Sequence, residues 1–153
     1  MAHVSRCGDP ARLPEILSVI HAAFGALRID PPSGALRETV DDLARRMASD
    51  TIFIAEEGGT VVGSVFCAPQ PSALYIGRLA VLPSHRRHGV AKALMHEAER
   101  EALCLGLAKL TLRARLMLPD NIAFFGSLGF VSGARHAHEG YARPTSVEMT
   151  RFL

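Results

Sequence analysis

The sequence has no tryptophan, only two tyrosines and only three cysteines. The cysteines are Cys7, Cys67 and Cys104, an odd number at wide spacing, which argues against a disulfide framework and against a Cys-x-x-Cys zinc knuckle. The seven histidines show no metal-ligand spacing either. We therefore expect reduced, partly buried thiols and no metal site.

The excess of positive charge is also small, because 17 basic residues nearly balance 15 acidic ones and the net charge is only +2. A broad basic face and stacking aromatic residues are missing, so nucleic acid is not an expected partner. No run of about 18 apolar residues occurs, and the first residues, MAHVSRCGDP, contain no apolar core of a signal sequence. We expect a cytoplasmic protein without a membrane partner.

What the sequence does contain is enough apolar material for a core. Its 153 residues are 48% hydrophobic, which suits a single domain over 1–153, because domains usually have about 100 to 200 residues. There is no internal repeat, linker or low-complexity tract.

Apolar periodicity predicts the order of helices and strands. We expect strands at 4–7, 51–55, 60–68, 74–81, 109–115, 130–135 and 145–152, with helices at 13–27, 36–47, 90–105 and within 118–130. The segment 56–59, Glu-Glu-Gly-Gly, predicts a hairpin turn. In the 36–47 helix, Leu36, Val40, Leu43 and Met47 are expected to face inward. Its charged residues are expected to face solvent: Arg37, Glu38, Asp41, Asp42, Arg45 and Arg46.

The segment 81–94, VLPSHRRHGVAKAL, joins a strand to a helix through an arginine- and glycine-containing turn. The first four N–H groups of a helix have no intrahelical partner, and the helix dipole favours an anion there. Gly89 leaves room at these amides, and Arg86, Arg87 and His88 supply charged or polar donors. The turn therefore predicts a site for a pyrophosphate. Neither a P-loop nor a Gly-x-Gly-x-x-Gly dinucleotide motif is present.

This turn resembles the acyl-CoA signature of the GNAT superfamily of N-acyltransferases, Arg/Gln-x-x-Gly-x-Gly/Ala, which Arg86, Gly89 and Ala91 match. The family also has a Leu-x-Val-x-Pro pattern before the turn, and here Leu79, Val81 and Pro83 stand in those places.

A second segment, LPDNIAFFGSLGF at 118–130, resembles the family's short helix beside the pantetheine arm. In the family a Gly-Phe pair starts the next strand, and Gly129 and Phe130 match that pair.

The resemblance implies an α+β fold with a mixed, mostly antiparallel sheet of six to seven strands and about four helices. The central strands 74–81 and 109–115 should be parallel and splay apart, with the thioester arm of the cosubstrate acetyl-CoA between them. The cofactor-binding residues that it implies are Leu79, Ala80, Val81, Arg86, Arg87, His88, Gly89, Val90, Ala91, Asn121, Phe124 and Phe125.

The implied reaction is direct attack of a primary amine on the thioester, with a backbone N–H near Val81 as the oxyanion donor. This sequence departs from the family at Phe125, where many members have a proton-donating tyrosine, and the 75–79 segment lacks the carboxylate that some members use as a base. A water chain is the default replacement for this base. The candidate residues are Glu139 and His138, and Tyr141 is a candidate for orienting the substrate or donating a proton.

In the family the acceptor site is built from two loops, which correspond to 29–39 and 137–146. Glu38 and Glu139 could attract a cationic amine, whereas Arg28, Arg37 or Arg143 could bind a carboxylate.

A small amine or an amino-acid-like molecule is the expected acceptor, and a protein N-terminus or lysine remains an alternative. A homodimer is also compatible with the resemblance. A second hypothesis, motivated by Phe125, is a non-catalytic acyl-CoA-binding regulatory module.

Overall fold

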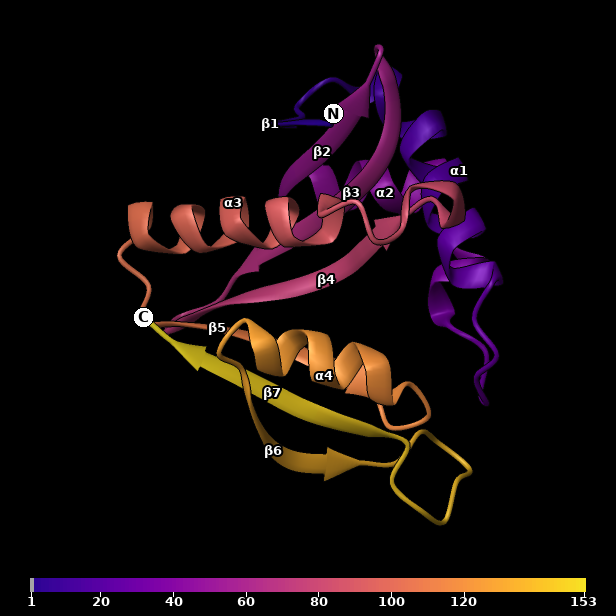
Figure 1. The fold of residues 1–153 in the computed structure, drawn as a ribbon, viewed down its shortest axis with the longest axis vertical. Coiled ribbons are helices and arrows are strands. Elements are labelled where there is room, and N and C mark those ends of the chain that lie inside the picture. Colours follow the sequence, from indigo (N-terminus) through magenta and orange to yellow (C-terminus); the bar gives the residue numbers. More distant parts are fainter. Residues whose placement is uncertain (1) are drawn as a thin grey trace.

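One seven-stranded mixed sheet runs through residues 2–153, which are the residues that the computed structural model describes (Figure 1). The strand order is β1-β2-β3-β4-β5-β7-β6, and only β4 and β5 are parallel neighbours. The strands are β1 (His3–Arg6), β2 (Thr51–Glu57), β3 (Thr60–Pro69), β4 (Ala73–Val81), β5 (Lys109–Arg115), β6 (Val131–His136) and β7 (Ser146–Phe152). The helices are α1 (Leu13–Gly25), α2 (Val40–Met47), α3 (Val90–Cys104) and α4 (Pro119–Ser127). The expected α+β architecture is confirmed.

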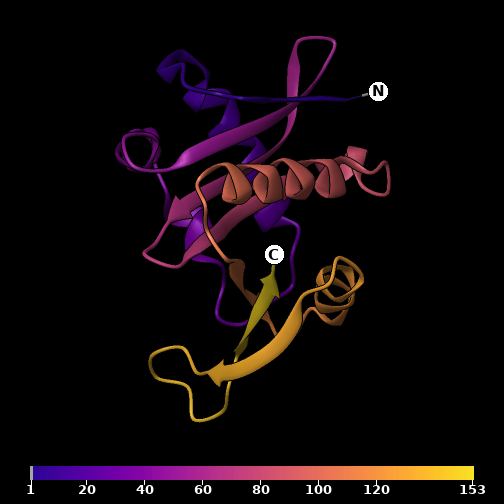
Figure 2. The same cartoon turned by 90° about the vertical axis from the view of Figure 1, so that its left-hand side faces the viewer.

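Helices cover both faces of the sheet because the central strands are apolar on both faces. In β2, Ile52 and Ile54 pack in the cluster under α1 and α2, whereas Phe53 and Ala55 pack in the cluster under α3 and α4. Figures 1 and 2 show α3 against the half of the sheet that contains β2–β4, and α4 beside the half that contains β5–β7.

The parallel pair separates along its length, as the resemblance implied. Only Ala73–Tyr75 of β4 pair with Lys109–Thr111 of β5, although β4 continues to Val81 and β5 to Arg115. Beyond that point β4 stays paired with β3, and β5 stays paired with β7. The sheet therefore opens into a wedge at the carboxyl ends of two parallel strands, which is where open α/β sheets commonly bind ligands.

A β-bulge interrupts β4 where it borders the wedge. Ser64 and Phe66 of β3 face Ala80 and Gly77 of β4, so β4 contains one extra residue. Within this bulge Arg78 adopts a left-handed conformation with φ 52°, which is uncommon for a residue other than glycine.

Glu38, which was expected on the solvent-facing side of the second helix, is buried. Its carboxylate is 9% exposed and accepts hydrogen bonds from Nε of Arg46, at 2.9 Å, and from Nε of Arg78. The prediction that Glu38 faces solvent is therefore wrong, because pairing with two arginines stabilises it inside the fold.

The predicted boundaries of three helices also need correction. The first, α1, ends at Gly25 and not at residue 27. A 3-10 helix at Gly34–Arg37 precedes α2. Thr39 is the N-cap residue of α2 and forms a reciprocal capping box with Asp42, so α2 begins at Val40. Leu36 consequently lies outside α2 and is exposed rather than inward-facing. The third of these helices, α3, ends at Cys104, and Leu105 beyond it is 49% exposed.

The thiols are free: Cys7 and Cys67 are buried and Cys104 is exposed. Burial raises the pKa of Cys67 to about 12, so this thiol stays protonated. Within residues 2–153, no helix is both long and apolar enough to cross a lipid bilayer.

The approach of α3 to β3 depends on Gly63. A Cβ built there would lie 2.9 Å from Cγ1 of Val90 and 3.1 Å from the carbonyl oxygen of Ala80. We expect Gly63→Ala to lower the free energy of unfolding by about 1–3 kcal/mol, because a stiff β-branched side chain and the backbone must move. Urea unfolding measures this loss.

Gly133→Ala is the matched control, because the nearest atom to its Cβ would be the carbonyl oxygen of Glu148 at an ordinary 3.7 Å. We expect the control to change stability by less than about 0.5 kcal/mol. Equal stability of the two variants would contradict the close packing of α3 on β3.

Candidate functional site

The turn between β4 and α3 exposes the N-terminus of α3. Gly89 is its N-cap residue, with φ 78°, and provides no side chain to cap the helix. Arg87 also adopts a left-handed conformation, with φ 64°. A Cβ at Gly89 would meet nothing within 4 Å, so the space in front of the first-turn amides is open. Free amides, the positive end of the helix dipole and nearby arginines together favour an anion.

Arg86 is held at this turn by α1. Its guanidinium donates to the carbonyl oxygen of Ala23, in the last turn of α1, at 3.3 Å. A cation at the C-terminal end of a helix is favourable, and this contact keeps the charge beside the anion site.

A pocket of about 660 Å³ extends from this turn into the wedge and is here called the cofactor pocket. Ten of the twelve residues that the sequence predicted for the cofactor line it: Leu79, Val81, Arg86, Arg87, Gly89, Val90, Ala91, Asn121, Phe124 and Phe125. Ala80 and His88 do not. Ala80 is 2% exposed and packs on the α1 side of the sheet.

The backbone of Val81 faces the wedge. Leu82 N–H donates to the carbonyl oxygen of Val62 in β3, at 2.9 Å, so the backbone groups of Leu82 point toward β3. Backbone groups alternate in direction along a strand, and those of Val81 therefore point away from β3. On that side β5 has already separated, which leaves the Val81 N–H directed into the open wedge.

A second pocket, of about 640 Å³, is here called the acceptor pocket and lies on the α1 side of the splayed strands. It shares lining residues with the cofactor pocket: Phe24, Leu27, Leu79, Leu118, Asn121 and Phe125. The two pockets are therefore continuous at the wedge, which lets molecules in the two pockets meet there.

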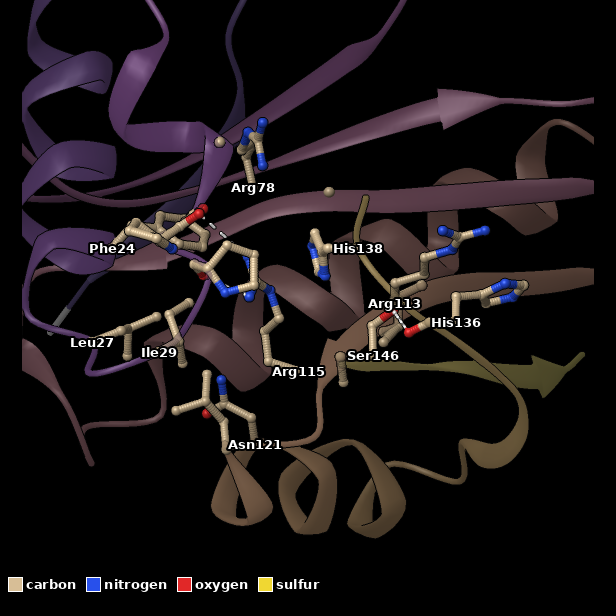
Figure 3. A pocket seen from close by; sticks show the side chains of 18 of the residues that line it. Phe24, Leu27, Ile29, Arg78, Arg113, Arg115, Asn121, His136, His138 and Ser146 are labelled. Carbon is tan, nitrogen blue, oxygen red and sulfur yellow. Dashed lines mark hydrogen bonds between the residues drawn. The ribbon is translucent and has the colours of Figure 1, made fainter. Parts of the chain in front are cut away.

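Polar side chains line the acceptor pocket. Figure 3 shows His138 between Arg78 and Arg113, with Arg115 and Asn121 nearby. Glu139, His138 and Tyr141, which were predicted for catalysis, all line this pocket.

Two hydrogen bonds connect the loops that form the pocket walls. Tyr141 Oη donates to Oδ1 of Asp30 at 2.5 Å, and Arg115 Nη1 donates to the carbonyl oxygen of Pro31 at 2.7 Å. The hydrogen bond to Asp30 raises the pKa of Tyr141, and burial lowers the pKa of the Arg115 guanidinium. The loop before α2, the loop before β7 and β5 thus form one connected wall.

His138 is positioned by Thr145. Its Nδ1 lies within hydrogen-bond distance of Thr145 Oγ1, which also accepts from the backbone N–H of His138 at 3.0 Å. Burial lowers the pKa of His138, and the positive charges of Arg115 and Arg113 lower it further. The imidazole is therefore neutral at neutral pH and can accept a proton.

Three residues proposed for acceptor binding lie elsewhere. Both carboxylate oxygens of Glu38 are used by Arg46 and Arg78, and Glu38 does not line the acceptor pocket. Arg28 and Arg143 do not line it either, whereas Arg37 does.

The sequence reasoning missed Arg113 and Arg115 as site residues. Their strand alternates buried Leu112 and Ala114 with these two arginines, so both arginines share one face of β5. The sequence places these two cations on one face near the carboxyl end of a strand that was predicted to be parallel to 74–81. Ligands commonly bind at the carboxyl ends of parallel strands, so this pattern could have identified both arginines.

Comparisons with known proteins agree with this geometry. The model of the Acetyltransferase (GNAT) family matches residues 16–130. N-acetyltransferase 8 of Rattus norvegicus is 31% identical over 107 residues, which cover 64% of this chain and 48% of that protein. The chain spans only about half the length of such curated relatives.

Solved structures resemble the fold over its whole length. The ribosomal-protein-S18-alanine N-acetyltransferase from Escherichia coli aligns with a TM-score of 0.81 at 20% identity, covering 99% of this chain and 94% of that one. The paia N-acetyltransferase from Thermoplasma acidophilum, in complex with coenzyme A, aligns with a TM-score of 0.82 at 14% identity, covering 100% and 99%.

Proposed function

Because the chain belongs to the acetyltransferase (GNAT) family, we propose that it transfers the acetyl group of acetyl-CoA to the primary amine of a small molecule. One observation carries the proposal: the cofactor pocket and the acceptor pocket meet where β4 and β5 separate.

The cofactor pocket suits the chemistry of CoA. The pyrophosphate binds at the N-terminus of α3, where Gly89 leaves space and Arg86 and Arg87 supply positive charge. The pantetheine arm lies in the wedge, where the unpaired backbone of β4 offers hydrogen bonds to its amides. The phenyl rings of Phe124 and Phe125 provide an apolar wall.

In the reaction, a neutral amine nitrogen attacks the thioester carbonyl, so a C–N bond forms and the carbonyl oxygen becomes an oxyanion. The Val81 N–H, directed into the wedge, donates a hydrogen bond to this oxyanion. Collapse of the intermediate breaks the C–S bond and expels the CoA thiolate. The nitrogen loses one proton and the thiolate gains one, which gives the amide and free CoA.

Phe125 leaves the departing thiolate without a tyrosine acid. Its ring is 9% exposed and packs edge-on against Phe124 and Phe130, with centroids 5.3 and 5.8 Å apart. Because a thiol has a pKa of only about 8.5, the thiolate leaves without prior protonation and takes a proton from water.

His138 is the proposed base that receives the proton of the amine. It lines the acceptor pocket, its imidazole is held by Thr145, and its lowered pKa keeps it neutral. Glu139 is exposed on the same loop and is the second candidate.

A small acceptor is proposed because the two loops around the acceptor pocket are hydrogen-bonded to each other through Tyr141 and Asp30. If the acceptor were a polypeptide, the rest of the acceptor's chain would have to leave the pocket between these two loops. The Escherichia coli structural neighbour is named for a ribosomal-protein acceptor, so a protein N-terminus is the alternative that experiments must compare.

We expect His138→Gln to lower kcat by about tenfold, because water can replace the base only partly. The ordinary pKa of histidine is 6.5 and that of His138 is lower, so protonation inactivates the base only below that pH. The acid limb of kcat at saturating acceptor should therefore lie below pH 6.5 in the native enzyme and disappear in the variant.

His3→Gln, at an exposed position in β1, is the control and should keep both kcat and its acid limb. An unchanged kcat profile for His138→Gln would remove His138 as the base.

The proposed activity is tested by measuring thiol release from acetyl-CoA across amines, amino acids, polyamines and peptides, with mass spectrometry of the acetylated product. Release that depends on a small amine, with one acetylated product per thiol, supports the proposal. Binding of acetyl-CoA without release by any acceptor would instead indicate a non-catalytic acyl-CoA-binding protein.

A further inference from the structure

The acceptor pocket contains more positive than negative side chains. Four arginines line it, Arg37, Arg78, Arg113 and Arg115, whereas Glu139 is the one carboxylate in the lining. The side chains that line the pocket therefore carry a net positive charge.

Two of the four arginines already have a carboxylate partner. Arg78 is paired with Glu38, and Arg113 Nη2 lies 3.8 Å from Oε1 of Glu148. Within residues 2–153, Arg37 and Arg115 have no carboxylate at ion-pair distance.

Arg115 is the more deeply placed of these two cations. It is half-buried, and its hydrogen bonds go to two neutral acceptors, the carbonyl oxygens of Pro31 and Pro32 at 2.7 and 3.4 Å. Asp30 lies near enough to favour the charged guanidinium, but its Oδ1 accepts from Tyr141 and its side chain does not line the pocket. A half-buried cation with only neutral partners gains most from an added anion.

Arg37, at the end of the 3-10 helix, adds a second charge to the pocket lining. Its Nη2 lies 3.6 Å from the position of a Cβ on Gly34, and Nη2 of Arg78 lies 3.9 Å from the same point. The guanidinium groups of Arg37 and Arg78 thus lie near Gly34, and Arg115 of β5 contacts the same loop at Pro31.

We infer that the acceptor is an amino acid, a small amine that also carries a carboxylate, and that Arg115 binds this carboxylate. The inference rests on the proposed function, since it names the substrate class of that reaction. A guanidinium matches a carboxylate with two parallel N–H groups, so the contact fixes the orientation of the acceptor. The single Glu139 at an exposed position leaves no comparable site for a polycationic amine.

The test compares each amino acid with its own carboxamide, which has the same side chain and an amine but no carboxylate. The panel includes α-, β- and γ-amino acids, and thiol release from acetyl-CoA gives kcat/KM for each. We expect at least one amino acid to be preferred over its carboxamide by about tenfold to a hundredfold, as is usual for hydrogen bonds to charged groups. In Arg115→Gln this preference should fall to within about threefold.

Arg115→Lys and Arg135→Gln separate recognition from structure. Arg115→Lys keeps the charge and should retain part of the preference for the carboxylate. Arg135→Gln, at an exposed position of β6 outside the pockets, should retain all of it. The affinity for acetyl-CoA, measured by calorimetry, should be the same in the native protein and in all three variants. This result would show that the loop contacts of Arg115 are not needed for the cofactor pocket.

The outcomes are distinguishable. Equal acetylation of amino acids and carboxamides, or acetylation of peptides alone, would overturn the inference while leaving the proposed acetyl transfer intact. A preference for the carboxylate that survives in Arg115→Gln would overturn the role of Arg115. Absence of thiol release with every acceptor, despite acetyl-CoA binding, would overturn the proposed function itself and the inference with it.

Discussion

Gly89→Asp is expected to reduce the affinity for acetyl-CoA by at least about 100-fold while the protein stays folded. The new carboxylate would project into the open space before the first turn of α3, where the proposed pyrophosphate binds. Two like charges about 4 Å apart near a protein surface repel by about 4 kcal/mol, which exceeds the roughly 2.8 kcal/mol of a 100-fold change. Isothermal titration calorimetry with acetyl-CoA measures the loss.

The control is Gly106→Asp, just beyond the other end of the same helix. Gly106 also has a positive φ, 70°, and a Cβ there would likewise meet nothing within 4 Å. The two variants therefore carry the same backbone strain and the same charge, but only one lies at the N-terminus of α3. Equal affinity of Gly89→Asp and Gly106→Asp for acetyl-CoA would reject the anion site.

Leu94→Ala is expected to have the largest effect on stability, about 3–4 kcal/mol, through the cavity that it leaves in the core. Leu94 is 0% exposed and lies on the side of α3 that packs against β3, where its Cδ1 would come within 3.1 Å of a Cβ on Gly63. For a chain of this length the loss corresponds to about 10 °C in Tm.

Leu103→Ala provides the comparison on the same helix, because Leu103 is 58% exposed. It removes the same atoms from the same type of structure, and the expected change is below about 0.5 kcal/mol. A similar loss in both variants would contradict the packing of α3 on the sheet, which is the contact that holds the anion site beside β4.

The parts of the fold that the sequence predicted well are those encoded by short-range patterns. The alternation in β5 and the helical spacing from Val90 onward predicted these elements, and the turn with Gly89 predicted an exposed helix N-terminus. The splayed parallel pair came from the family resemblance, because strand pairing joins residues far apart in the chain.

Misplaced residues were those whose environment depends on distant partners. Glu38 looked like part of a solvated helix face, but Arg78, 40 positions away, pairs with it inside the fold. Arg115 was not predicted as a site residue, and it contacts the loop at Pro31, 84 positions away. No local pattern contains such contacts, so the partners of Glu38 and Arg115 became visible only in three dimensions.

A crystal structure of the protein with bound acetyl-CoA would test the central claim most directly. The claim predicts the pyrophosphate on the backbone amides at Gly89 and the pantetheine between β4 and β5. It also predicts the thioester oxygen within about 2.7–3.2 Å of the Val81 nitrogen, facing the acceptor pocket. Acetyl-CoA bound outside the wedge, or a thioester that does not reach Val81, would contradict the claim.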